Sequence, residues 1–245
     1  MMRESVTGDR VTREPVTRSP FFLVMSVSAL LVALAGFSTT LFLPLARGTF
    51  RAPVAVNVHG ALFFGWVLLL VMQSWLVSQR RVATHRTIGW AGAAIAGGMM
   101  VSGVIVGFWA TRRDVAAGGG DFAVGQLPNI IIEMLLFGAL VGGAIVMRRK
   151  REWHKRLMLL ATISVLGPAW LRFRHFLPGI ENPFVVFSLV ADAIVLVAVA
   201  HDLITQRRVH PAYYIVGTIM VAIHFVELFA ITSPPWLAAG RWLLR

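Results

Sequence analysis

Five ionisable residues lie inside otherwise apolar stretches of this chain, and their types are those that bind metal ions or transfer protons. Each would cost about 2.5–3.5 kcal/mol to place in hydrocarbon, so residues of this kind are functional candidates. Two of them, His224 and Glu227, are three positions apart and would share one face of a helix. The five residues are His59, Glu133, Asp192, His224 and Glu227.

The apolar stretches that carry these residues predict seven membrane-spanning helices, because each is close to the roughly 20 residues needed to cross hydrocarbon. The composition agrees, since 57% of the 245 residues are hydrophobic, 14% are charged and the mean hydropathy is +0.74. We therefore predict an all-α, polytopic membrane bundle. The expected spans are 21–45, 54–78, 86–110, 127–147, 153–173, 184–205 and 211–231.

The chain divides into three parts around these spans. Residues 1–20 are polar and rich in Arg, which predicts a disordered basic tail, and residues 21–235 form the transmembrane domain. Residues 236–245 carry Trp236, Trp242 and Arg245, which is typical of a segment at the membrane interface. Pro128 is expected near a helix start, and the glycine-rich stretch 112–122 is expected to be a flexible connection.

Basic residues give the chain a formal charge of +12, but they stand in short clusters between apolar runs. That distribution excludes nucleic acid as a partner and is typical of topology signals. Fifteen of the 23 Lys and Arg residues fall on the side of the N-terminus and eight on the other side. We therefore predict a cytoplasmic N-terminus and an outside C-terminus, in the inner membrane of a bacterium. The absence of cysteine excludes disulfides and thiolate metal sites.

All five ionisable residues are expected at a similar depth, roughly 7–12 Å below the outer boundary. Two imidazoles and three carboxylates can hold a divalent cation such as zinc, iron or manganese. The same groups can also simply satisfy one another between helices. Neither His-x-x-x-His nor His-Glu-x-x-His occurs. The inner halves of the spans are nearly free of ionisable groups, which argues against a transport pathway.

Histidines also stand at two inner helix starts. His85 opens the third span in the sequence His-Arg-Thr-Ile-Gly, and His154 opens the fifth in His-Lys-Arg-Leu-Met. The segment from His59 through Gln73 to Gly89 resembles two core helices of the transmembrane di-haem b-type cytochromes that move electrons from ascorbate. It is also similar to bacterial membrane families of uncharacterised function with His-Arg-x-x-Gly helix starts. The resemblance covers roughly 50 of the 245 residues.

This resemblance implies axial ligands for haem b. His59 would ligate an outer haem and His85 an inner one, whereas the family's other two ligands have no clear match in this sequence. By their side of the membrane and depth, His224 or His175 could partner His59, and His154 could partner His85. Basic residues near the inner pair would bind the propionates. Those residues are Arg86, Lys155 and Arg156.

The alternative interpretation of these histidines is that His85 and His154 belong to basic loops that set topology. By the same reasoning His201 and His210 are expected to be solvated loop residues. The third span is rich in glycine, which predicts a central position in the bundle because small residues let helices approach closely.

Three functions follow from these observations. The first is a membrane redox protein with haem b or a divalent metal, such as zinc or iron, that transports electrons. The second is a non-enzymatic subunit or assembly factor of a larger membrane complex, whose buried polar residues are structural. The third is a metal-dependent membrane enzyme that acts on a lipid or a quinone.

Overall fold

The computed structural model describes residues 20–245, and no strand occurs among them. The predicted tail, residues 1–20, lies outside the described residues except for Pro20. Ten α-helices are described, together with short π and 3₁₀ turns. The helices are α1 (Phe21–Phe37), α2 (Leu43–Ala46), α3 (Val54–Ser78), α4 (Val82–Ala116), α5 (Gly120–Val146), α6 (Arg151–Ser164), α7 (Gly167–Leu171), α8 (Pro183–Gln206), α9 (Thr218–Ala230) and α10 (Pro234–Leu243).

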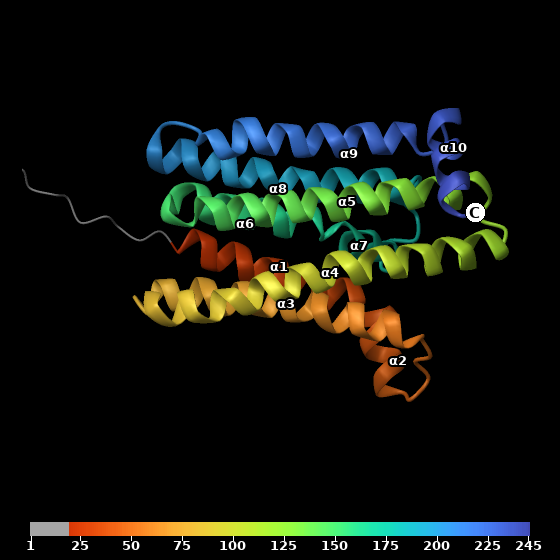
Figure 1. Cartoon of the computed structure of the whole chain (residues 1–245), viewed down its shortest axis with the longest axis horizontal. Coiled ribbons are helices and arrows are strands. Elements are labelled where there is room, and N and C mark those ends of the chain that lie inside the picture. The colour runs from red at the N-terminus through yellow and green to blue at the C-terminus, as the bar shows by residue number, and fades with distance from the viewer. Residues whose placement is uncertain (1–19) are drawn as a thin grey trace, which may run out of the picture.

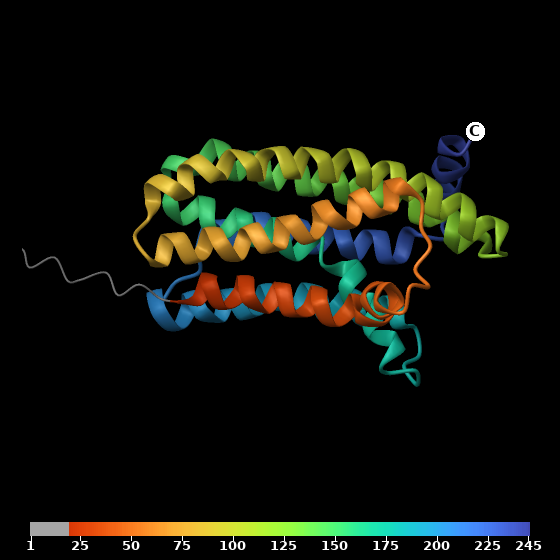
Figure 2. The ribbon, with the colours of Figure 1, turned by 90° about the horizontal axis from the view of Figure 1, so that it is seen from below.

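Seven helical segments of the described chain are long and apolar enough to cross a membrane, which confirms the predicted number of spans. The long helices run side by side along the long axis of the bundle (Figures 1 and 2). We call the end at which α1 begins the tail end, and the opposite end, which carries α10, the far end. Large apolar side chains cover the outside of the bundle, and Phe229, for example, is 67% exposed. An apolar exterior suits a lipid environment.

The expected boundaries are close for most spans and wrong at the far-end connection between α4 and α5. The observed span Val54–Ser78 equals the expected one, whereas α4 extends to Ala116 and α5 already begins at Gly120. Gly118 and Gly120, with φ of 87° and 57°, make the connection a tight turn instead of a flexible loop. Pro128 therefore lies inside α5, not at its start. Membrane helices tolerate an internal proline because neighbouring groups satisfy the freed carbonyl.

The central helix of the bundle is α6, not the glycine-rich α4. The span formed by α6 and α7 is 61% buried, against 33% for the span of α4. The glycines of α4 do permit close approach, since a Cβ at Gly98 would meet Leu62 of α3 and one at Gly103 would meet Met134 of α5. Those contacts occupy only part of the circumference of α4. Close approach to two neighbours is therefore not enough to make a helix central.

The central span, formed by α6 and α7, is interrupted near a proline and contacts its neighbours through aromatic residues. Helix α6 ends at Ser164, and α7 begins one turn later with Pro168 in its first turn, which interrupts the span. On the α6 side of that break, Thr162 accepts a hydrogen bond of 3.2 Å from Trp66 Nε1, and the Trp66 ring packs edge-on against Phe137 of α5. This contact ties α3, α5 and α6 together in the middle of the bundle.

Candidate functional site

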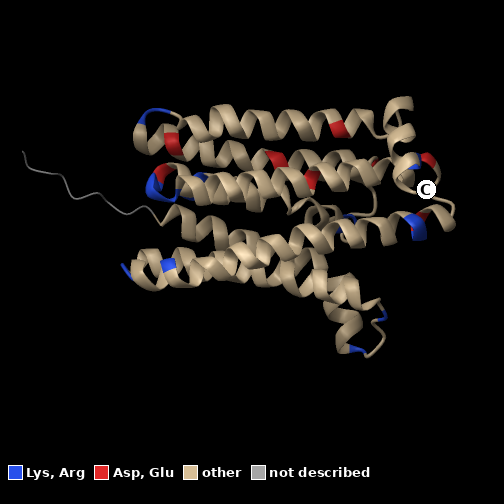
Figure 3. Cartoon of the chain, viewed as in Figure 1, with Lys and Arg blue, Asp and Glu red and all other residues tan. Residues whose placement is uncertain are grey.

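Three of the five predicted ionisable residues are joined toward the far end by one hydrogen bond and one ion-pair contact. His224 of α9 lies between two carboxylates, with its Nδ1 at 2.6 Å from Asp192 Oδ1 and its Nε2 at 2.9 Å from Glu133 Oε1. Figure 3 shows the acidic positions of α5, α8 and α9 within lengths of helix that are otherwise free of charge. The Nδ1 contact is a hydrogen bond, whereas Nε2 makes no hydrogen bond among residues 20–245 and faces Glu133 at ion-pair distance.

Glu227 joins this group one turn further along α9. It is only 6% exposed, and its side chain is in hydrogen-bonding contact with that of Glu133. Glu133 Oε2 and Glu227 Oε1 are both buried and find no donor among residues 20–245. We call Glu133, Asp192, His224 and Glu227 the far-end cluster. The sequence predicted a similar depth for these four residues, and in the structure their side chains also lie close to one another.

His59 does not take part in the far-end cluster. Its Nδ1 lies 3.0 Å from the Ser102 hydroxyl of α4, and Ser102 in turn donates to the Met99 carbonyl at 3.3 Å. Within the described chain His59 makes no hydrogen bond or ion pair with the acidic residues of the far-end cluster. Because the Ser102 proton is used for Met99, His59 Nδ1 is the donor and its Nε2 keeps a free lone pair.

A metal ion or an outer haem could use a histidine of this region as its ligand only if a ring nitrogen is free. Both nitrogens of His224 face carboxylates, so in this arrangement neither presents a lone pair to a metal ion or to a haem iron. Among residues 20–245 no group of three or more His, Asp or Glu side chains has the geometry to hold a metal ion. His175, the other expected partner for His59, is exposed in a 3₁₀ turn, Arg172–His175. An outer haem ligand pair is therefore not assembled here.

The tail end brings the other two predicted histidines together. The ring centres of His85, in the first turn of α4, and His154, in the first turn of α6, are 6.1 Å apart and the ring planes are 85° to each other. His154 Nδ1 is 2.8 Å from the Ala144 carbonyl of α5, which leaves Nε2 as the free nitrogen. His85 Nδ1 is buried without a hydrogen bond, and the Gln73 backbone lies beside the His85 ring.

Gln73 of α3 adds an unusual feature to this histidine pair. Both polar atoms of its side-chain amide are buried without a hydrogen-bond partner among residues 20–245. Buried amides of this kind are rare because leaving one unpaired costs about 1–3 kcal/mol. Gln73 belongs to the segment that carries the cytochrome resemblance, and its amide is free to receive a ligand.

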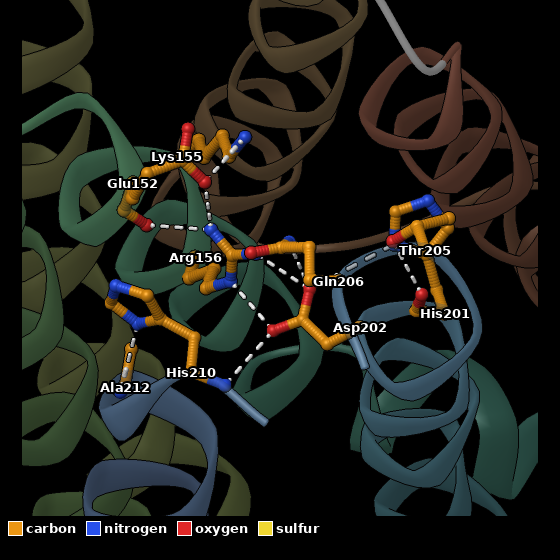
Figure 4. Close-up of polar contacts among 9 residues, drawn as sticks. All are labelled: Glu152, Lys155, Arg156, His201, Asp202, Thr205, Gln206, His210 and Ala212. Atoms are coloured by element: carbon orange, nitrogen blue, oxygen red, sulfur yellow. Dashed lines mark hydrogen bonds and ion pairs between the residues drawn. The ribbon is translucent and has the colours of Figure 1, made fainter. Parts of the chain in front are cut away.

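A second tail-end group was missed by sequence reasoning. Arg156 of α6 is fully buried and makes two hydrogen bonds to Asp202 of α8, from Nε to Oδ2 at 3.0 Å and from Nη2 to Oδ1 at 2.5 Å (Figure 4). Its Nη1 contacts Glu152 one turn earlier. Arg156 is thus already paired and is not free for a haem propionate. Asp202 is the only acidic residue near the tail end of its span, which was the signal in the sequence.

The two histidines expected in solvated loops are both tied to this group. His201 lies inside α8, where its Nδ1 is 3.9 Å from Asp202 Oδ1 and its ring stacks on Phe21 with ring centres 3.8 Å apart. His210 lies between α8 and α9, its backbone N–H donates to Asp202 Oδ2 at 3.1 Å, and its Nδ1 accepts from the Ala212 N–H at 3.1 Å. Burial lowers the pKa of His210, and the nearby Arg156 guanidinium lowers it further.

Comparison with known proteins gives no relative on which a function could be based. No family model, no curated protein and no solved structure matches this chain. A function must therefore be inferred from the geometry of the far-end cluster and of the His85–His154 pair.

Proposed function

We propose that this chain is an integral membrane redox protein in which His85 and His154 are the axial ligands of a b-type haem. The observation that carries the proposal is the separation of the two rings, 6.1 Å between centres. Two metal–nitrogen bonds of about 2 Å each, with ligating nitrogens about 1 Å from their ring centres, span roughly the same distance. The resemblance of this segment to di-haem b-type cytochromes supports the same assignment.

The residues around the pair fit a haem in donor type. The hydrogen bond of His154 Nδ1 to a backbone carbonyl fixes the tautomer in which Nε2 is the ligating atom, and histidine ligands are commonly held in this way. The unpaired Gln73 amide can donate to a bound group. Exposed Arg86, next in sequence to His85, can pair with a propionate in place of the already paired Arg156.

Such a haem would supply one-electron transfer and no substrate site, because two histidines fill both axial positions. The chain's own residues would then hold the cofactor between α4 and α6 and keep it out of lipid. The Lys and Arg distribution supports a cytoplasmic tail end in a bacterial inner membrane, with the haem near the cytoplasmic side. Its electron donor or acceptor would be a quinone or another subunit of a membrane complex.

An absorption spectrum of the purified protein tests this proposal. After expression with sufficient haem supply, we expect a Soret band and sharp visible bands on reduction, with about one haem per chain. His85→Ala and His154→Ala should each abolish this spectrum, because loss of either ligand breaks the six-coordinate site. His175→Ala, which changes an exposed histidine, is the matched control and should leave it unchanged.

Two outcomes would overturn the haem assignment. One is a folded, monodisperse protein that stays colourless and takes up no added haem, which would favour the structural subunit. The other is a haem spectrum that persists in both His85→Ala and His154→Ala. A colourless protein that contains stoichiometric zinc or iron would instead favour the metal-dependent enzyme.

A further inference from the structure

We propose that the far-end cluster is a proton-binding site, in which Glu133 and Glu227 share one proton while His224 is held as an imidazolium between Glu133 and Asp192. This inference goes beyond electron transfer at the tail end and does not depend on a bound haem. The ligand of the acidic residues would be a proton, which agrees with the number of carboxyl groups in the cluster and with the contacts between them.

Charge balance favours a bound proton in the far-end cluster. The cluster contains three carboxyl groups and one imidazole, and the groups that act electrostatically on Glu227 are Glu133 and Asp192 from α5 and α8 and His224 from α9. If all four were ionised, two negative charges would be uncompensated inside an apolar bundle. Carboxylates in contact cannot both stay ionised in such surroundings, and one of them retains a proton. One shared proton reduces the excess to a single negative charge.

Two carboxyl oxygens of the far-end cluster lack a hydrogen-bond donor among residues 20–245. Glu133 Oε2 and Glu227 Oε1 are each buried without a hydrogen-bond donor, and they belong to side chains that contact each other. A contact between two carboxyl groups becomes a hydrogen bond only if one of them carries the proton. A single proton on this pair therefore satisfies both side chains at once. Glu227 is 6% exposed, so water does not offer an equivalent donor.

The geometry of the far-end cluster suits a proton better than a metal ion. The position between Glu133 and Asp192, where a cation would bind, is taken by the His224 ring, with contacts of 2.9 and 2.6 Å. What is left for Glu227 is a contact with a single further carboxyl group. Glu133 is 22% exposed in its side chain and is therefore the less buried member of the pair.

Infrared spectroscopy of the purified protein in lipid nanodiscs, near neutral pH, tests the proposal. A protonated carboxyl group has a carbonyl stretch that is separate from the carboxylate bands and shifts in deuterium oxide. We expect such a band in the unmodified protein, and its loss in both Glu133→Gln and Glu227→Gln. Glu181→Gln removes an exposed glutamate from the connection before α8 and is the matched control, which should keep the band.

A fourth variant keeps the test decisive if one glutamine variant misfolds. His224→Gln removes the imidazolium while it leaves all three carboxyl groups, so a second carboxyl should become protonated and the band should grow about twofold. The proposal is wrong if the unmodified protein shows no protonated carboxyl band. It is also wrong if the band survives in folded Glu133→Gln and Glu227→Gln, or if His224→Gln leaves the band unchanged. Haem content is unaffected by these outcomes, so this test and the haem test fail independently.

Discussion

Arg156 and Asp202 form a buried ion pair with two hydrogen bonds that joins α6 to α8 at the tail end of the bundle. Asp202 also accepts from the backbone N–H of His210, so the same carboxylate holds the connection to α9. Gln206 Nε2 adds a further hydrogen bond to Asp202 at 3.0 Å (Figure 4). One acidic side chain thus holds α6, α8 and the connection between α8 and α9 together.

Breaking this pair is expected to cost much of the stability of the bundle. Asp202→Asn leaves the buried Arg156 charge with only the half-exposed Glu152 as a counter-charge, and removal of one partner of a buried pair costs about 3–5 kcal/mol. Thermal unfolding in detergent, followed by circular dichroism, measures the change. Glu152→Gln is the control, because Glu152 is 51% exposed and its contribution should stay below about 1 kcal/mol. Equal unfolding temperatures of the two variants would contradict this role for the pair.

Protonation of His210 is expected to destabilise the fold. The pKa of His210 is lowered by burial and by Arg156, so below about pH 6.5 the unfolded chain binds more protons at this site than the folded chain. Stability should therefore fall as the pH is lowered through this range, and the hydrogen bond that Nδ1 accepts from Ala212 would be lost. Unfolding temperatures across a pH series for the unmodified protein and for His210→Gln isolate the effect. The prediction fails if both curves have the same slope.

Gly36 is expected to be required for the contact between α1 and α7. A Cβ at this position would lie 2.3 Å from the Ala169 carbonyl oxygen, which belongs to a backbone that cannot easily retreat. Gly36→Ala should therefore destabilise the bundle by about 1–3 kcal/mol. Gly60→Ala, in α3, meets no atom within 4 Å and should be neutral or stabilising by up to about 1 kcal/mol. Thermal unfolding of the two variants compares them, and similar losses in both would refute the steric argument.

Helix α10 is expected to detach from the bundle when Asn129 is replaced. Trp236 Nε1 donates to Asn129 Oδ1 at 2.6 Å, and loss of the acceptor leaves a half-buried indole N–H unpaired, at a cost of about 1–3 kcal/mol. Asn129→Ala should increase hydrogen exchange over residues 234–243, as followed by mass spectrometry. Arg241→Ala removes an exposed ion pair with Asp121 from the same helix and should change exchange much less. If the Arg241 variant has the larger effect, the Trp236 contact is not the anchor.

The depth of the far-end cluster could be predicted from the sequence, whereas the pairing of Arg156 with Asp202 could not. Glu133, Asp192, His224 and Glu227 could be assigned to one depth, because depth follows from the position within a span at 1.5 Å per residue. Asp202 and Arg156 were not recognised as partners, since both stand near span ends where charged residues usually meet solvent. The exclusion of His59 from the cluster was also invisible, because it depends on how far α3 is rotated toward Ser102 of α4.

The sequence by itself determined the seven apolar spans and the depth of the ionisable residues, because crossing hydrocarbon requires a fixed length of continuous apolar helix. Only the tertiary structure decided which polar groups meet, placing both nitrogens of His224 against carboxylates and His85 beside His154. The physical reason is that a helix with apolar residues all around its circumference carries no signal for its own rotation. Partner choice then depends on close contacts between neighbouring helices, which no single segment contains.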